Sequence, residues 1–207
     1  MRTIEDEWMS KSSREFMPTY VFITVNVAVY VFTSILSGSL NTSDGVVSAV
    51  GQINANVWNG EVWRLFTAIF VHADILHIFG NMFFLLIFGL RAEDMFDIKE
   101  YILIYFLSGL SGGLLTLALW PPNTVSIGAS GAIFGVLGAT IVYARHSIRQ
   151  SIMGALLFAL FFFVINLGPD VNYLAHLGGL ATGLLIGYAL ATTRRYKFAS
   201  HEYNYPR

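Results

Sequence analysis

Four polar side chains that can do chemistry interrupt long apolar stretches of this sequence. Ser130 stands between glycines in SIGASGAIFG, His176 stands in AHLGGLATG, and His77 and Asn81 stand four residues apart in HIFGN. A serine beside a histidine is the minimal pair of nucleophile and general base. Residues four apart share one face of a helix, so His77 and Asn81 can both donate hydrogen bonds to a developing oxyanion. These residue types indicate acyl transfer by a serine nucleophile.

Two other interpretations concern the histidines. His72 lies close to His77 in the sequence and can equally be a structural hydrogen-bonding residue. A metal site fits poorly, because the histidines have no carboxylate beside them in the membrane and the chain has no HExxH pattern. We therefore expect no metal and no other cofactor.

The composition indicates a membrane protein. Of the 207 residues, 55% are hydrophobic and 12% are charged, and the mean hydropathy is +0.61. Soluble domains typically carry about 25% charged residues. The formal net charge of −1 gives no reason to expect a nucleic-acid partner. The absence of cysteine excludes disulfides and thiolate metal sites.

Six apolar segments are candidates for helices that cross the bilayer, which needs about 20 residues. They cover residues 18–37, 65–90, 101–120, 128–144, 152–167 and 171–191. The sequence thus predicts an all-α integral membrane protein, a six-transmembrane-helix bundle that occupies residues 18–191. A cytoplasmic segment at 1–17 precedes this domain, and a basic cytoplasmic tail at 192–207 follows it.

The basic residues predict the direction of these helices. With the N-terminus in the cytoplasm, 11 of the 12 lysines and arginines fall on the cytoplasmic side, and Arg64 is the exception. Both termini are then cytoplasmic. A cleaved signal peptide is the alternative for the first segment, but its apolar run is longer than a usual h-region and residues 1–17 carry four acidic side chains. Without a targeting peptide, we expect a prokaryotic inner membrane.

Residues 38–64 form a long first outer loop, and its tryptophans and other apolar residues predict that part of it lies in the membrane interface. The second, fourth and sixth predicted helices then all run from the outside inward. His77, Ser130 and His176 lie in the outer halves of these three helices. The sequence therefore brings the reactive side chains toward one leaflet.

Glycines predict close contact between the fourth and sixth helices, since small residues let membrane helices approach. The glycines of these two segments are Gly128, Gly131, Gly135, Gly138, Gly179, Gly183 and Gly187. Close approach would bring Ser130 within reach of His176. Because Ser130 lies near a helix N-terminus, unpaired N–H groups there would favour an oxyanion.

The order and spacing of four motifs resemble those of the rhomboid family of intramembrane serine proteases. The motifs are EVWR at 61–64, HIFGN at 77–81, GASG at 128–131 and AHLGGLATG at 175–183. The resemblance extends over nearly the whole chain. It implies a rhomboid-like fold, a serine endopeptidase activity, and transmembrane proteins as substrates in the lipid bilayer.

The resemblance also implies roles for individual residues. Ser130 would attack the scissile carbonyl and His176 would act as general base, with no third carboxylate. His77, Asn81 and the Ser130 amide would form the oxyanion hole.

Three further roles follow from the same resemblance. Arg64 would brace the first loop, and Glu93 would brace the inner ends of the second and third helices. Many family members have a tyrosine one turn after the serine, stacked beneath the histidine, and here that residue is Phe134. Phenylalanine keeps the flat face but has no hydroxyl. What orients His176 is therefore left open.

Two other classes of function compete with a protease. A non-catalytic relative would bind and escort membrane proteins, but such proteins usually lack the serine or the histidine, and this chain has both. A transporter or channel would continue its polar path to the inner leaflet, whereas Thr140 is the only polar residue below Ser130 in the fourth segment. We therefore predict an intramembrane serine endopeptidase, and the sequence sets no oligomeric state.

Overall fold

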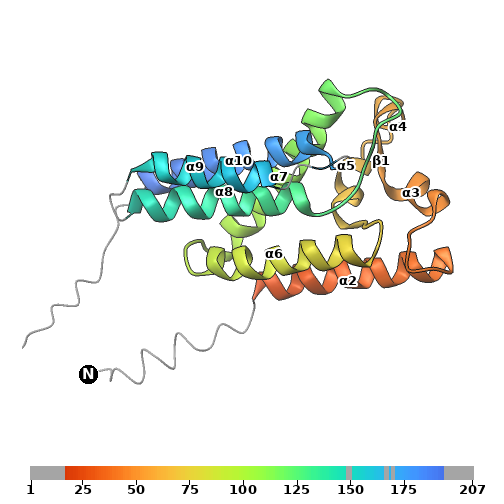
Figure 1. Cartoon of the computed structure of the whole chain (residues 1–207), viewed down its shortest axis with the longest axis horizontal. Helices are drawn as coiled ribbons and strands as arrows, with labels where there is room; N and C mark the ends of the chain where they lie inside the picture. The colour runs from red at the N-terminus through yellow and green to blue at the C-terminus, as the bar shows by residue number, and fades with distance from the viewer. Residues whose placement is uncertain (1–16, 148–150, 166–167, 169–170, 194–207) are drawn as a thin grey trace, which may run out of the picture.

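The computed structural model describes residues 17–147, 151–165, 168 and 171–193. Six helices of 14 residues or more make up most of this part of the chain. They are α2 (Pro18–Ser37), α6 (Ile75–Glu93), α7 (Ile98–Leu119), α8 (Ser130–Ser147), α9 (Ile152–Ile165) and α10 (Tyr173–Thr193). Figure 1 shows α2 beside α6, with α8, α9 and α10 across the molecule from them. Helix α8 is central, because it packs against α6, α7, α9 and α10.

Within the described residues, four helices are long and apolar enough to cross a membrane, namely α2, α6, α7 and α10, which have 19 to 22 residues each. Helix α8 has 18 residues and is largely enclosed by its neighbours, and 14 residues of α9 are described. The predicted segments at 1–17 and 192–207 lie outside the described residues, apart from Met17 and residues 192–193.

The predicted second helix at 65–90 is wrong at its outer end. Two short helices, α5 (Arg64–Thr67) and η1 (Ala68–Phe70), come first, and a non-helical segment at 71–74 separates them from α6. Asp74 Oδ1 accepts hydrogen bonds from the N–H groups of Leu76 and His77 at 2.8 and 2.9 Å. This cap fixes the start of α6.

The other helix boundaries lie within a few residues of the predicted ones. The prediction of 18–37 for the first helix is confirmed, with Pro18 in its first turn and Gly38 at φ 62° after its last residue. Helix α7 begins three residues before the predicted start, because Asp97 and Glu100 form a capping box there. Helices α8 and α10 each begin two residues later than predicted.

Helices α8 and α10 touch through their backbones. A methyl group placed on Gly179 would collide with the carbonyl oxygen of Gly131, and one on Gly183 would collide with that of Gly135. The next glycine of the series, Gly187, faces the carbonyl oxygen of Ala139 in the same way. Three glycines at intervals of four therefore form the seam along which these helices pack.

At the start of α2, polar groups join this helix to α6 and α7. Glu93 Oε1 accepts a hydrogen bond from the N–H of Thr19 at 2.7 Å, which places this carboxylate at the first turn of α2. The hydroxyls of Thr19 and Tyr101 lie 3.1 Å apart. The family resemblance implied that Glu93 braces the second and third predicted helices. In the structure, Glu93 also contacts the first helix, α2.

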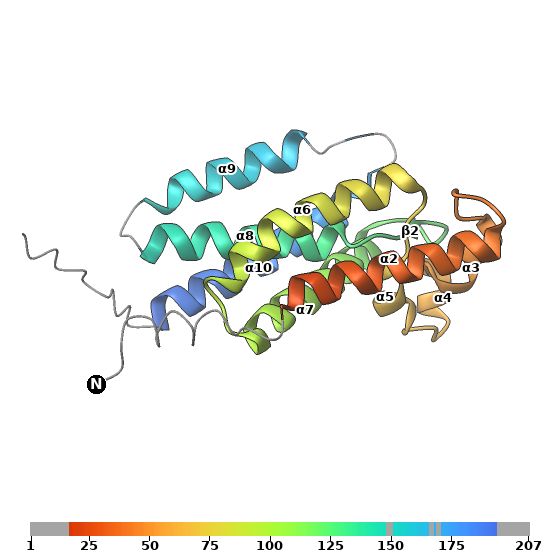
Figure 2. The same ribbon diagram turned by 90° about the horizontal axis from the view of Figure 1, so that it is seen from below.

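The first outer loop folds into two short helices and a short strand, and α5 follows at its end. The loop elements are α3 (Asp44–Val50), β1 (Gln52–Ile53) and α4 (Asn54–Trp58), and β1 pairs antiparallel with β2 (Val125–Ser126) in the loop before α8. In the part of the chain that the structure describes, this two-residue pairing is thus the only β-structure, and the other regular elements are helices. Figure 2 shows the loop elements gathered at one end of the bundle.

Buried polar side chains hold this loop against the outer end of α7. Gln52 Nε2 donates to the carbonyl of Gly113, and Asn54 Nδ2 donates to that of Thr116, at 3.0 and 3.2 Å. Both side chains are 2% exposed or less, so these bonds replace water that the groups lose on burial. Arg64 braces the same loop, because it donates to the carbonyl of Gly51 at 2.8 Å.

We predict that Gly183→Ala lowers the melting midpoint of the purified protein. The added methyl meets the Gly135 carbonyl, and overpacking of this kind costs about 1–3 kcal/mol. Gly80→Ala in α6 is the control, because no atom lies within 4 Å of the added methyl there. Thermal unfolding in detergent measures both, and equal midpoints for the two variants would contradict the backbone contact.

Candidate active site

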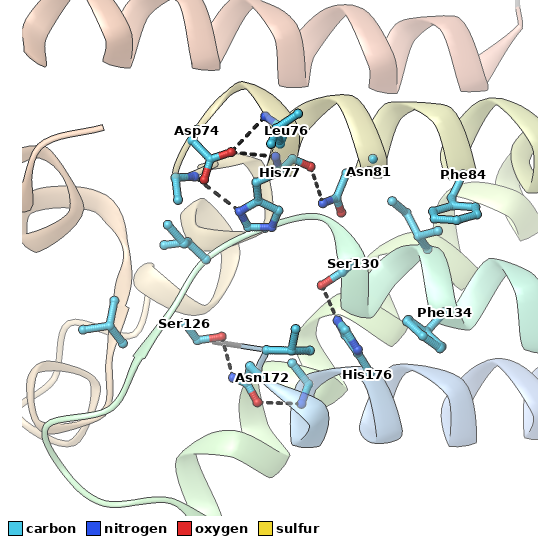
Figure 3. Close-up of a pocket in the computed structure, with 18 of the residues that line it drawn as sticks. Asp74, Leu76, His77, Asn81, Phe84, Ser126, Ser130, Phe134, Asn172 and His176 are labelled. Atoms are coloured by element: carbon cyan, nitrogen blue, oxygen red, sulfur yellow. Dashed lines mark hydrogen bonds between the residues drawn. The ribbon is translucent and has the colours of Figure 1, made fainter. Parts of the chain in front are cut away.

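The first residue of α8 and the first turn of α10 meet at the outer end of the glycine seam. There Ser130 Oγ and His176 Nε2 lie 2.8 Å apart, which is hydrogen-bond distance (Figure 3). The two residues are 46 positions apart in the sequence. Because Gly131 and Gly179 let the backbones touch just below them, the packing of α8 on α10 sets this distance.

The ring of His176 is held by packing. The rings of Phe134 and His176 stack with centroids 4.4 Å apart and an interplanar angle of 20°. The ring centroid of Phe162 of α9 lies 5.3 Å from that of Phe134. In the described part of the chain, the buried Nδ1 of His176 has no hydrogen-bond partner. No polar group among the described residues therefore orients the imidazole through Nδ1, the ring nitrogen that does not face Ser130.

His77 and Asn81 of α6 line the cavity that also contains Ser130 and His176 (Figure 3). The Nδ1 of His77 accepts a hydrogen bond from the N–H of Ala73 at 3.4 Å, which favours the neutral ring with its hydrogen on Nε2. This Nε2 lies beside Gly128, since a methyl placed on Gly128 would come within 2.8 Å of it. Asn81 donates one N–H to the carbonyl of His77 at 2.8 Å.

The segment before Ser130 has a backbone that only glycine adopts readily. Gly128 has φ 117°, a conformation that strains other residues, and its N–H donates to the carbonyl of Ala68 at 2.9 Å. The N–H of Ala129 donates to His72 Nε2 at 3.5 Å. With these N–H groups occupied, the N–H of Ser130 is the first in α8 that has no acceptor within the helix.

His72 lies outside the helix in which the sequence placed it, in the segment at 71–74. It is fully buried, its Nδ1 lies 3.2 Å from the carbonyl of Phe70, and its Nε2 accepts from Ala129. Burial lowers the pKa of His72 from 6.5 to about 3, with a further contribution from His77. These contacts are those of a structural residue, the alternative that the sequence left open.

Asn172 is a residue of the site that sequence reasoning missed. Its Oδ1 accepts from the N–H of Ala175 at 3.0 Å and so caps α10, and its Nδ2 donates to Ser126 at 2.8 Å and to Thr116 at 3.0 Å. One amide thus ties α10 to β2 and to the end of α7. An asparagine directly before an apolar helix is an N-cap signal that could have revealed it.

A cavity of about 550 Å³ opens beside these side chains, a size typical of ligand sites. Its walls come from the start of α6, β2 and the residues after it, α8, Phe162 of α9, and the start of α10. Within the described ranges, no group of three or more histidines, cysteines or carboxylates is placed to hold a metal ion. The side chains of Ser130, His176, His77 and Asn81 all line this one cavity.

Helices of membrane length that enclose a serine–histidine pair put this chain among the polytopic membrane proteins. A family model described as the Rhomboid domain matches residues 59–193, which is well over half of the sequence. The chain belongs to the rhomboid family, as its motifs predicted, and it is an integral membrane protein.

Several named proteins are similar to this chain. RHOMBOID-like protein 6, mitochondrial, of Arabidopsis thaliana is 42% identical over 159 residues, which is 73% of this chain and 52% of the relative. Rhomboid-like protease 3 of Toxoplasma gondii is 32% identical over 80% of this chain and 66% of its own length. Rhomboid protease GluP of Bacillus subtilis (strain 168) is 32% identical over 83% of this chain and 34% of its own length. The chain spans about half the length of the Arabidopsis relative.

We predict that the stability contributed by neutral His72 is lost in acid. Its pKa in the folded protein lies below the unfolded value of 6.5, so the unfolded state takes up a proton first. Stability should therefore fall as the pH drops from about 6.5 toward 3, by at most about 1.4 kcal/mol per pH unit from this group. Denaturant unfolding of the parent and of His72→Gln at pH 7.5 and 5 measures the difference.

The His72→Gln variant isolates this residue from the carboxylates that titrate in the same range. The stability advantage of the parent over the variant should be smaller at the lower pH. An advantage that is the same at both pH values would contradict the assignment.

Proposed function

We propose that this chain is a serine endopeptidase that hydrolyses peptide bonds in or near transmembrane segments of other membrane proteins. The observation that carries the proposal is the 2.8 Å contact between Ser130 Oγ and His176 Nε2, beside a cavity in a membrane protein. Similar proteins that are named as proteases, from Bacillus subtilis and Toxoplasma gondii, support it. The serine and histidine supply nucleophile and base themselves, so the proposed reaction uses no cofactor.

The proposed reaction has two halves. Ser130 Oγ bonds to the scissile carbonyl carbon while its proton passes to His176 Nε2. The tetrahedral intermediate then collapses, the C–N bond breaks, and His176 returns the proton to the leaving amine. Water attacks the acyl-enzyme in the second half with His176 again as base, which releases the new carboxyl end and restores Ser130.

Three donors would stabilise the oxyanion. The N–H of Ser130 has no acceptor within α8, because Ser130 is the first residue of this helix, and the helix dipole is positive there. The second donor is the Nε2–H of His77, because a neutral imidazole whose Nδ1 accepts a hydrogen bond carries its hydrogen on Nε2. Asn81 has a second N–H besides the one that it donates within α6.

The edge of β2 offers a place for an extended substrate segment. Strand β1 pairs with one edge of β2, and Val125, Ser126 and Ile127 line the cavity beyond it. A peptide bond must leave its helix before a serine can attack it, because helical carbonyls are hydrogen-bonded. Addition of a strand at β2 would replace those lost bonds.

We also propose how the chain lies in its membrane. All six long helices would cross, with both termini in the cytoplasm and the first outer loop partly in the interface, as charge and hydropathy indicate. A substrate would enter between α6 and α9, where Phe84 and Phe88 pack edge-on against Phe162 at 5.1 and 5.4 Å. The relatives come from a plant, a protozoan and a bacterium, so they favour no particular membrane.

Two competing functions fit the structure less well. A channel needs polar groups along its path, whereas the residues of α8 below Ser130 are buried and almost all apolar, and the hydroxyl of Thr140 is bonded to the carbonyl of Val136. A non-catalytic binding protein needs no serine at hydrogen-bond distance from a histidine. The dyad therefore favours catalysis.

We predict that Ser130→Ala and His176→Ala each lower cleavage of a model transmembrane substrate by at least about 10³-fold, and that the double variant is no worse. Groups that act as one unit give losses that do not add. Purified protein in vesicles with a labelled substrate measures the rate. Ser48→Ala, an exposed serine of α3 outside the cavity, is the matched control and should cleave like the parent. Cleavage retained by Ser130→Ala would refute the proposal.

We predict that Phe134→Tyr retains activity and that Phe134→Ala loses most of it. Removal of the ring leaves a cavity that costs about 3–5 kcal/mol in a packed core and frees the imidazole to turn away from Ser130. Phe79→Ala, at an exposed position of α6, is the control for loss of a ring. Rates are compared well below the melting midpoint, and equal rates for Phe134→Ala and the parent would show that the ring does not position His176.

A further inference from the structure

One carboxylate lies in the wall of the cavity. Among the described residues that line it, Asp74 alone carries a full charge, and the others are apolar, small or neutral polar. The other titratable side chains of the lining are the imidazoles of His77 and His176, and the hydrogen bond that His77 Nδ1 accepts favours a neutral ring. Figure 3 shows Asp74 beside His77, on the side away from Phe134.

Asp74 has one oxygen to spare. Both capping hydrogen bonds, from the N–H groups of Leu76 and His77, end on Oδ1. In the described part of the chain Oδ2 has no hydrogen-bond partner, and the residue is half-buried. A cap needs one oxygen and no charge, since asparagine and serine serve as well. The second oxygen and the charge are therefore available to a ligand in the cavity.

No described cation cancels this charge inside the cavity. Arg64 is the basic residue of the first outer loop, and its guanidinium is paired with Glu61 at 2.6 Å and does not line the cavity. A half-buried carboxylate in apolar walls is screened less by water than one on an open surface. The cavity therefore presents a negative field to whatever enters it.

We propose that Asp74 is a specificity-determining residue that selects substrates with a lysine or arginine next to the scissile bond and disfavours acidic residues there. The inference rests on the proposed protease function, and it names the substrate class of that site. A basic side chain would reach Oδ2 and form a charge-assisted hydrogen bond. An acidic side chain would meet the same oxygen with like charge.

The test is a series of model transmembrane peptides with lysine, glutamine or glutamate placed in turn at each position that flanks the cleaved bond. Cleavage is measured as kcat/KM in phosphatidylcholine vesicles, so that the lipid adds no net charge. For the parent we expect a lysine-to-glutamate ratio of about tenfold for at least one position, falling with added salt. In Asp74→Asn, which keeps the cap, the ratio should fall to near one.

Matched variants separate the charge from other effects. Asp44→Asn removes a carboxylate from the exposed start of α3, outside the cavity, and should keep the ratio of the parent. Asp74→Ser caps without charge and should behave like Asp74→Asn. The inference is overturned if the parent and Asp74→Asn give the same ratio at every position, or if the parent prefers glutamate.

A binding arm distinguishes this failure from failure of the proposed function. The Kd of each peptide is measured with Ser130→Ala, with and without Asp74→Asn. One outcome is that no Ser130-dependent cleavage is detected, while lysine peptides bind more tightly and this preference is lost in Asp74→Asn. That outcome would refute the protease and retain the charge selection. Cleavage that depends on Ser130, with ratios unaffected by Asp74, would refute the charge selection and retain the protease.

Discussion

The contact of α8 with α10 is the constraint on which the rest of the structure depends. Carbonyl oxygens of α8 occupy the space that Cβ atoms of α10 would need. They fit because Gly179, Gly183 and Gly187 have no side chain. Lipid gives helices no hydrophobic reason to associate, so close packing of this kind supplies the association. At the outer end of the seam the same closeness brings Ser130 to 2.8 Å from His176.

The loops around that seam are held by buried polar groups whose bonds are made within the protein. Gln52 and Asn54 bind backbone carbonyls at the outer end of α7, Asn172 joins α10 to β2, and His72 binds the backbone before Ser130. Each of these groups would be costly to bury alone. Bonded as they are, they fix irregular backbone at the rim of a membrane domain, where it must be satisfied by protein.

The imidazole of the dyad is placed by an aromatic ring. The family resemblance left open what orients His176 where Phe134 replaces a tyrosine, and the structure shows a ring stacked on it and no described partner for Nδ1. Stacking fixes the plane of the imidazole without fixing which nitrogen holds the proton. The hydrogen bond with Ser130 then turns Nε2 toward the serine hydroxyl.

The sequence by itself determined the membrane class, the family and most of the long helices, and it named the serine and histidine that the structure brings together. Length, hydropathy and glycine spacing are local properties, and they can be read along one chain. The sequence-based prediction failed at 65–90, because the apolar residues on both sides of 71–74 read as one segment and mean hydropathy does not identify Asp74 as a helix cap. The tertiary structure alone decided the roles of His72, Asn172 and Gln52. Their partners lie 46 to 61 residues away in sequence, and only folding brings such groups within a hydrogen bond.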